Sequence, residues 1–285
     1  MLGTPATHWV LTFVCADAAG IVHALSGAIV QAGGNITESR QFSSADTGRF
    51  FIRLQVETAA TREQLVARLT PVASRFDAEW LLDVVGRPAR TLVLVSTAAH
   101  CLNDLLFRQR SGLLPVEVPL VLSNHATLEG LAGFYGVPFE THAVGSPASK
   151  AAFEERVLAA VEELDVELVV LARYMQILSP ELCARLPGRI INIHHSFLPG
   201  FKGANPYKQA HERGVKLTGA TAHFVTPDLD EGPIIEQNVV RVDHTASARD
   251  LVATGQDVEA RTLTQAVRWF AEHRVLLDGQ RTIIL

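Results

Sequence analysis

Two residue types that serve acyl chemistry, an amide and an imidazole, stand two positions apart at Asn192 and His194. Residues 189–193, which include Asn192, are mainly apolar and are predicted to form a buried strand. Side chains two positions apart on a strand point to one face. If the strand continues to His194, Asn192 and His194 therefore share a face and His195 points to the other. From these residues alone a structural interpretation is equally open, in which Asn192 caps the strand and His194 is an ordinary satisfied polar residue.

A second polar patch joins the predicted strands 218–225 and 234–242. Thr221, His223 and Val225 fall on one strand face, and an acidic loop from Asp228 to Gly232, which includes Asp230, follows them. A solvated hairpin turn is the ordinary explanation of such a cluster. If the loop meets the first patch, however, a carboxylate orients an imidazole that moves protons, and an amide donates to a developing oxyanion. Together the two patches predict a hydrolytic site.

Other chemistries fit the sequence less well. The side chains of His194, His195, His211, His223 and Asp230 are all metal-ligand types, but adjacent His residues on a strand diverge and no His-Glu-x-x-His spacing occurs. No Gly-x-Ser-x-Gly elbow is present for a serine nucleophile. The first strand of the second predicted domain leads into residues 96–100, which contain no glycine, so no phosphate loop for a nucleotide is expected there. We therefore predict neither a metal nor a cofactor besides the substrate.

The elements that must position these groups are predicted in two domains. Residues 1–86 have the pattern βαββαβ, which gives an antiparallel sheet with helices on one face, as in ferredoxin-like folds. The predicted strands are 9–14, 35–43, 49–57 and 80–85, and the predicted helices are 21–31 and 61–73. Residues 86–90 are short and polar, contain a proline, and are predicted to be a linker.

Residues 91–285 alternate between strands and helices, which predicts an α/β domain with a mostly parallel, doubly wound, Rossmann-like sheet. Five strands are predicted at 91–95, 116–122, 139–143, 168–171 and 189–193. Helices are predicted from 101, from 127, at 149–164 and at 180–186, and a long hairpin and a final helix at 248–273 end the chain. In this arrangement both polar patches belong to one domain.

Composition restricts the partners. The chain has 285 residues, of which 48% are hydrophobic and 19% charged, and its net charge is −5. Its basic residues are scattered, so we expect a small-molecule ligand, no nucleic acid and no membrane. The three cysteines, Cys15, Cys101 and Cys183, are far apart in the sequence, and no signal peptide precedes the first strand. We therefore expect a cytoplasmic protein.

The two polar patches resemble the folate-dependent formyltransferase-fold family. Asn192-Ile193-His194-His195-Ser196-Phe197-Leu198-Pro199 and Asp228-Leu229-Asp230-Glu231-Gly232-Pro233 carry the resemblance. It implies that Asn192, His194 and Asp230 are catalytic. It also implies a folate pocket, whose residues would be Met175, Gln176, Ile177, Leu178, Thr221, His223, Val225 and Asp228. Gln176 stands where relatives often have a basic residue, which leaves main-chain contacts at that position.

Within that family the chain is most similar to the formyltetrahydrofolate deformylases. The double histidine, residues 203–207 and the ending Arg281-Thr282-Ile283-Ile284-Leu285 carry this likeness. Residues 1–86 resemble an ACT domain, a regulatory module that often senses amino acids. The resemblance implies a small effector, such as an amino acid, at Asp17, Gly20, Ile21 and Asn35. It also implies a homo-oligomer, because ACT modules commonly pair.

The resemblance implies hydrolysis of 10-formyltetrahydrofolate to tetrahydrofolate and formate, which would supply formate and balance one-carbon folate pools for purine synthesis. Formyl transfer to an amine is the alternative. A ribonucleotide acceptor needs a phosphate cradle, which residues 96–100 do not offer, and a tRNA acceptor favours a basic surface. A third hypothesis is a folate or amino-acid sensor without activity, which would have no use for Asn192, His194 and Asp230 together.

Overall fold

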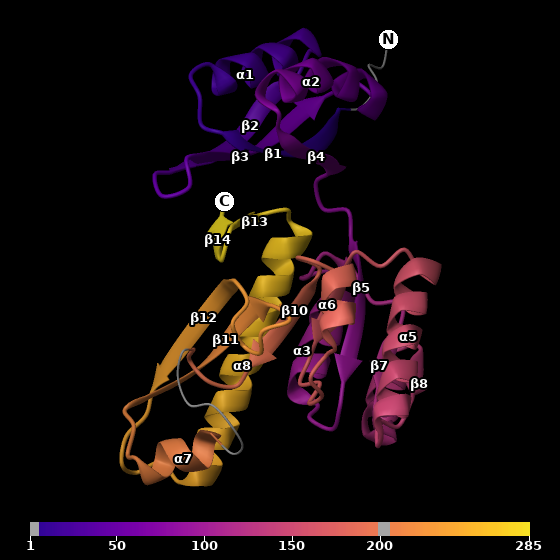
Figure 1. Ribbon diagram of the computed structural model, residues 1–285, viewed down its shortest axis with the longest axis vertical. Coiled ribbons are helices and arrows are strands. Elements are labelled where there is room, and N and C mark those ends of the chain that lie inside the picture. The colour runs from indigo at the N-terminus through magenta and orange to yellow at the C-terminus, as the bar shows by residue number, and fades with distance from the viewer. Residues whose placement is uncertain (1–5, 199–205) are drawn as a thin grey trace. The chain divides into compact units, whose positions relative to one another are not determined.

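Figure 1 shows a computed structural model of the chain, which describes residues 6–198 and 206–285. The chain divides into two compact units, Met1–Arg87 with Glu272–Leu285 and Pro88–Ala271. The predicted second domain, 91–285, therefore includes a C-terminal segment that the structure groups with the first unit. Pro199 and residues 203–205, which contribute to the resemblance above, lie outside the described residues.

The first unit has the predicted βαββαβ order. Its elements are β1 (Thr7–Ala16), α1 (Ile21–Gln31), β2 (Asn35–Ser44), β3 (Arg49–Thr58), α2 (Arg62–Phe76) and β4 (Glu79–Val84). The strands form an antiparallel sheet in the order β2-β3-β1-β4. Leu25 of α1 and Leu65 of α2 are buried in one core with Phe13 and Ile52 of the sheet, so both helices cover the same face. Figure 1 shows the two helices side by side above the sheet.

Local sequence signals explain the ends of these helices. Thr61 and Gln64 form a reciprocal capping box at the start of α2, which satisfies amide groups that have no partner within the helix. Gly20 precedes α1 with a φ of 94°, a left-handed conformation that glycine adopts without steric strain. The turn that positions α1 therefore depends on the residue type at position 20.

A C-terminal hairpin that the sequence analysis does not predict completes this unit. Strands β13 (Val275–Asp278) and β14 (Arg281–Ile284) pair with each other. Leu285 is buried with Val14 and Phe51 on the sheet face that α1 and α2 do not cover. The hydroxyl of Ser44 donates a hydrogen bond of 2.7 Å to Asp278. These contacts explain why the end of the chain belongs to the first unit.

The second unit contains a mixed sheet in the order β12-β11-β10-β9-β5-β7-β8. The parallel strands are β5 (Ala89–Val95), β7 (Val121–Ser123), β8 (Phe139–Thr141), β9 (Leu168–Leu171) and β10 (Ile190–His194). Two antiparallel strands follow β10, namely β11 (Leu217–Phe224) and β12 (Ile234–Arg241). The single strand predicted at 116–122 is divided into two strands in the structure. These are β6 (Val116–Glu117), which pairs with β5, and β7, and Pro119 lies between them.

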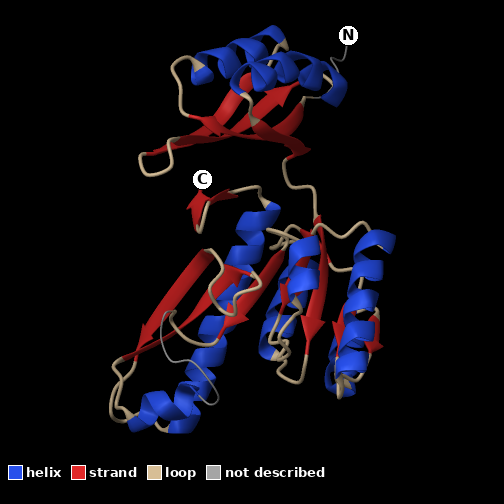
Figure 2. Ribbon diagram, viewed as in Figure 1, coloured by secondary structure: helices blue, strands red, loops and turns tan. Residues whose placement is uncertain are grey.

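Helices cover both faces of this sheet, as the alternating pattern predicts. They are α3 (His100–Arg110), α4 (Glu129–Tyr135) after a 3-10 turn η1 (Ala126–Leu128), α5 (Pro147–Glu163), α6 (Pro180–Arg185), α7 (Pro206–Glu212) and α8 (Ala248–Ala271). Figure 2 shows them around the strands. Ile190 of β10 is buried with α5 and α6, whereas Ile191 pairs with Phe224, whose ring contacts Phe270 of α8. Consecutive residues of β10 thus face opposite helical layers.

None of the helices within residues 6–198 and 206–285 has both the length and the apolar character required to span a membrane. All three cysteines are buried and unpaired. The short helix α7 and the hairpin of β13 and β14 are elements that the sequence analysis did not predict.

Candidate active site

A cavity of about 240 Å³ lies over the carboxyl ends of β9 and β10. The strand order changes direction between β9 and β5, and ligands of open α/β sheets bind at such switch points. The cavity is lined by all the predicted catalytic and folate-contacting residues except Thr221. These are Met175, Gln176, Ile177, Leu178, Asn192, His194, His223, Val225, Asp228 and Asp230. Side chains from three separate segments therefore meet at one site.

Strand register explains part of this convergence. The antiparallel pairing of β10 with β11 places Asn192 opposite His223 and His194 opposite Thr221. Residues directly opposite each other in neighbouring strands share a face, so these four side chains point to the same side of the sheet. The prediction that Asn192 and His194 share a face is confirmed.

Asp230 fixes His194 from the acidic loop. Its Oδ1 atom lies 3.2 Å from Nδ1 of His194 and 3.7 Å from Nε2 of His223. The hydrogen bond from His194, together with the nearby imidazole of His223, holds the pKa of Asp230 well below its usual range, so this group is a carboxylate at neutral pH. Nε2 of His194 is buried and has no hydrogen-bond partner among the described residues. His194 therefore has one nitrogen bound to Asp230 and the other available to a ligand.

His223 orients the amide of Asn192. Nδ1 of His223 lies 2.8 Å from the carbonyl oxygen of Phe224. A carbonyl only accepts, so Nδ1 carries a proton and, in the neutral ring, Nε2 is the acceptor. Nδ2 of Asn192 lies 3.3 Å from that Nε2 atom and donates to it. The amide nitrogen is thereby turned toward the imidazoles, and its second proton remains available.

The loop after β11 carries Asp230 in an unusual conformation. Asp230 has a φ of 58°, in the left-handed region that only a few residue types visit readily. The hydroxyl of Thr226 donates a 3.1 Å hydrogen bond to the carbonyl of Asp228, which shapes the loop before Asp230. A Cβ atom at Gly232 would overlap the carbonyl oxygen of Phe224, so the close approach of the loop to the strand requires glycine.

An apolar segment borders the cavity. Met175 and Ile177 are 57% and 61% exposed, which is high for such side chains, and Leu178 is buried beneath them. The amide of Met175 donates a 3.0 Å hydrogen bond to the hydroxyl of Ser96, which ties this segment to the end of β5. Small-molecule pockets are commonly lined by apolar side chains with a few polar groups that orient the ligand, and this segment with the catalytic groups forms such a lining.

Thr221, which the resemblance assigns to the folate pocket, lies away from the cavity. It is fully buried and does not line the cavity. Its hydroxyl donates to the carbonyl of Ser196 at 3.0 Å and accepts from the amide of Leu198 at 3.1 Å. The segment after β10 turns back over Thr221, so this residue holds that segment in place instead of facing a ligand.

His195 and Arg173 are among the cavity residues that sequence reasoning did not assign to the site. Strand β10 ends at His194, and the ring of His195 lies 5.1 Å from that of His194. Burial, together with the nearby charges of Arg173 and His194, lowers the pKa of His195 to about 4, which makes its ring neutral at pH 7. Arg173 follows the buried strand β9 directly, and a charged residue at that point was a usable signal.

One cluster of metal-ligand types occurs within residues 6–198 and 206–285. The ligand atoms of His100, Cys101 and Glu259 lie within 4.8 Å of one another. Glu259 already accepts hydrogen bonds from His100 and Tyr207 and pairs with Arg173, and burial raises the pKa of the Cys101 thiol well above its ordinary value. With the carboxylate engaged and the thiol protonated, this cluster is a hydrogen-bonded network and a poor ligand set for a metal.

The predicted effector residues lie around the start of α1 and of β2. The amide of Asp17 donates to the carbonyl of Gly48 at 2.8 Å, and Gly20 forms the left-handed turn before α1. The side chain of Ile21 is 2% exposed and belongs to the core. Any effector contact of Ile21 must therefore come from its backbone. Asn35 is exposed at the first position of β2.

The chain is similar to proteins of known family. The family model described as formyl transferase matches residues 89–267. A protein named formyltetrahydrofolate deformylase from Corynebacterium sp. (strain P-1) is 48% identical over 97% of each chain. A protein of the same name from Bacillus subtilis (strain 168) is 44% identical over 95% of this chain and 91% of its own.

Solved structures give the same result for the fold. The crystal structure of formyltetrahydrofolate deformylase from Burkholderia mallei ATCC 23344 matches with a TM-score of 0.94 and 47% identity, over 98% of this chain and 99% of that one. The crystal structure of glycinamide ribonucleotide transformylase 1 from Symbiobacterium toebii matches with a TM-score of 0.65 and 36% identity, over 71% of this chain and 96% of that one.

Proposed function

Because this chain belongs to the formyl transferase family, we propose that it hydrolyses 10-formyltetrahydrofolate to tetrahydrofolate and formate. Curated relatives that match nearly the whole chain, at 48% and 44% identity, are named for that reaction. The observation that carries the proposal at the level of chemistry is the contact of His194 with Asp230 at 3.2 Å, beside the amide of Asn192.

These three groups can divide the chemistry of formamide hydrolysis. Asp230, as a carboxylate, orients His194 and the attacking water. The amide of Asn192 and the Nε2–H of protonated His194 donate to the formyl oxygen as it becomes an oxyanion, and each such donor contributes about 2.7–4 kcal/mol. The tetrahedral intermediate collapses by breaking the bond between the formyl carbon and N10. The N10 amine leaves with a proton that it takes from His194, and the proton that the attacking water gives up restores His194. The formyl group departs as formic acid, which loses its remaining acidic proton to solvent and becomes formate.

The folate is assigned to the segment from Met175 to Leu178 and to the loop that contains Val225 and Asp228. The exposed apolar side chains of Met175 and Ile177 offer a surface to the flat pterin ring. Backbone groups of the same segments are available for the polar edge of the ring. In this arrangement the pterin ring binds at the apolar segment, and the formyl group on N10 reaches His194.

An assay without any acceptor tests this function. The purified full-length chain is incubated with 10-formyltetrahydrofolate in buffer that contains no primary amine. We expect formate and tetrahydrofolate to appear in equal amounts. A strict requirement for an added amine would refute hydrolysis in favour of formyl transfer, and folate binding without turnover would indicate a sensor.

Asn192, His194 and Asp230 supply the proton transfer and the oxyanion donors that hydrolysis requires, so we assign no role to a metal or to a second cofactor. Full activity after dialysis against a strong chelator is the expected result. Activity that is lost on chelation and restored by one metal ion would contradict this assignment.

We propose further that the first unit is an ACT-type regulatory module that binds a small effector such as an amino acid. We also propose that the chain forms a homo-oligomer and acts in the cytoplasm. Its role there would be to supply formate and balance folate pools for purine synthesis. The βαββαβ order and the Gly20 turn support the module. Kinetics of the full chain across a panel of amino acids test the effector, and unchanged kinetics with every member would argue against it.

A further inference from the structure

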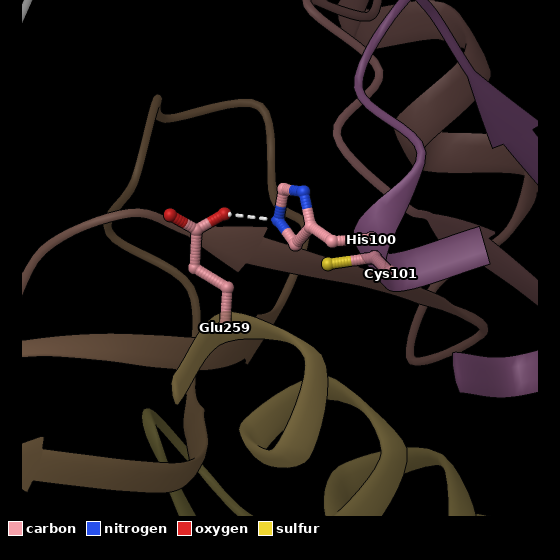
Figure 3. A group of neighbouring side chains, drawn as sticks. All are labelled: His100, Cys101 and Glu259. Atoms are coloured by element: carbon pink, nitrogen blue, oxygen red, sulfur yellow. Dashed lines mark hydrogen bonds and ion pairs between the residues drawn. The ribbon is translucent and has the colours of Figure 1, made fainter. Parts of the chain in front are cut away.

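A buried polar cluster lies against the cavity and has no part in the mechanism above. Its centre is Glu259 of α8, whose side chain is 1% exposed. Figure 3 shows the Glu259 carboxylate facing the ring of His100, which begins α3, at 2.8 Å. Glu259 also pairs with Arg173 at 3.3 Å and accepts a hydrogen bond from the hydroxyl of Tyr207. One carboxylate thus ties together four separate segments of the second unit.

The cluster reaches the catalytic groups through two of its neighbours. Arg173 and His195 both line the cavity that contains Asn192 and His194. The ring of His195 lies between two others, 5.1 Å from that of His194 and 6.3 Å from that of Tyr207. Polar side chains are therefore continuous from α8 to the catalytic imidazole.

Two local features show that the sequence maintains this cluster at a cost. Arg173 has a φ of 64°, a left-handed conformation that is strained for a residue with a side chain. Its Nε atom lies 3.3 Å from Glu259 without forming a hydrogen bond, and one terminal nitrogen is buried without a hydrogen-bond partner in the described parts of the chain. A Cβ atom at Gly255 would overlap the ring of Tyr207, so α8 requires glycine there. Strain and unsatisfied donors of this kind are concentrated at functional sites.

The cluster has a consequence for the choice of acceptor. A transferase must admit an amine, with its substituents, to the formyl carbon, whereas a hydrolase must admit only water. Here Arg173 and His195 line the cavity that contains His194, so the substituents of an amine acceptor would have to fit beside them. The Arg173 cation also repels a protonated amine.

We propose that Arg173, held in place by Glu259, and His195 form an acceptor-excluding wall that reserves the catalytic centre for water. The inference rests on the proposed hydrolysis and names the residues that prevent formyl transfer. Specificity of this kind is a difference between two rates, and it requires an element that disfavours the wrong partner. Arg173 is that element, and Glu259, His100 and Tyr207 position it.

Arg173→Gly in the full-length chain tests the wall, because glycine removes the side chain and is unstrained at a φ of 64°. Asp165→Gly is the matched control, since Asp165 also has a positive φ, of 47°, is exposed and does not line the cavity. Each protein receives 10-formyltetrahydrofolate with glycinamide, a small primary amine, over a range of concentrations. Formate and N-formylglycinamide are measured by mass spectrometry in the same reaction.

We expect wild type and Asp165→Gly to give the same low ratio of formylated amine to formate, and Arg173→Gly to raise that ratio roughly tenfold or more. An unchanged ratio in an active Arg173→Gly variant would overturn the proposal. Loss of both products in a folded variant that still binds folate would also overturn it, because Arg173 would then belong to the chemistry. Wild type that releases no formate without amine would instead refute the proposed function.

A second variant protects the test against misfolding. Glu259→Gln keeps the shape of the side chain but removes the charge that holds Arg173. If Arg173→Gly does not fold, Glu259→Gln decides the question. We expect a smaller rise in the same product ratio, of roughly threefold, with little change in KM for the folate. An active Glu259→Gln variant whose ratio equals that of wild type would contradict the positioning role.

Discussion

Replacing Asp230 by Asn isolates the charge that organises the catalytic centre. The substitution keeps the size of the side chain, and asparagine tolerates the left-handed conformation at a φ of 58°. What it removes is the carboxylate 3.2 Å from His194 and 3.7 Å from His223. The variant therefore tests electrostatics with little added backbone strain.

The magnitude follows from the geometry. A carboxylate and a protonated imidazole 3.2 Å apart attract each other by about 5 kcal/mol at an effective dielectric constant of about 20. The amide of asparagine and nearby water recover part of this energy. We expect a net loss of about 3–4 kcal/mol of transition-state stabilisation, which is roughly a 10²- to 10³-fold fall in kcat. KM for the folate should change much less, because the apolar segment that is assigned to the ring is untouched.

The assay is steady-state formate release by wild type, Asp230→Asn and the control Asp165→Asn. Asp165 also has a positive φ, of 47°, and is exposed away from the cavity, so its variant reproduces the change of charge and backbone. Because the pKa of Asp230 is lowered by its imidazole partners, it stays ionised as the pH falls through the range of ordinary carboxylates. The acid limb of the wild-type profile should therefore not reflect protonation of Asp230. Turnover of Asp230→Asn within about threefold of wild type would refute the reasoning, since that corresponds to less than 1 kcal/mol.

Three further predictions concern single groups. Asn192→Ala should lower kcat by roughly 10²- to 10³-fold with a small change in KM, in the same formate assay, because one oxyanion donor is lost. Gly232→Ala should lower kcat about tenfold or more, since its Cβ would displace the loop at the carbonyl of Phe224, and a kcat equal to that of wild type would show that the loop tolerates a side chain. Burial raises the pKa of Asp83, but hydrogen bonds from Arg87, the backbone and His273 outweigh it and lower this pKa to about 2. The stabilisation is thus present above the unfolded-state pKa of about 4 and is lost as pH falls toward 2. Urea unfolding should show Asp83→Asn to be less stable by about 1 kcal/mol at pH 7, with a difference that shrinks toward pH 3.

Sequence periodicity predicted most of the fold because most elements bury one face. Helix α1 and strand β9 have the bounds predicted from apolar spacing and from a short apolar run. The errors have local causes. Pro119 divides the strand predicted at 116–122, because proline cannot donate to the ladder. The C-terminal hairpin escaped prediction because its strands are short and its stability comes from packing on Phe51, which is distant in sequence.

The candidate site was predictable only where strand geometry determines it. The shared face of Asn192 and His194 follows from alternation along β10, and the pairing with His223 follows from the register of β11. The positions of His195 and Arg173 depend on where a strand ends and on a left-handed backbone conformation, neither of which periodicity reveals. Thr221 was assigned to the folate pocket from the family resemblance, and its hydroxyl instead binds the segment after β10.

The contact between Asp230 and His194 requires the loop to reverse its direction. Because β11 runs antiparallel to β10, its end lies beside the beginning of β10, where the amide of Val225 donates to the carbonyl of Ile190 at 2.9 Å. His194 stands at the other end of β10, so the loop must fold back along the face of the sheet for Asp230 to reach it. The left-handed conformation of Asp230 and the close approach at Gly232 are what permit this reversal. The catalytic contact therefore depends on backbone conformation as much as on side-chain type, and for this reason we expect Gly232→Ala to impair kcat even though Gly232 has no side chain to take part in the reaction.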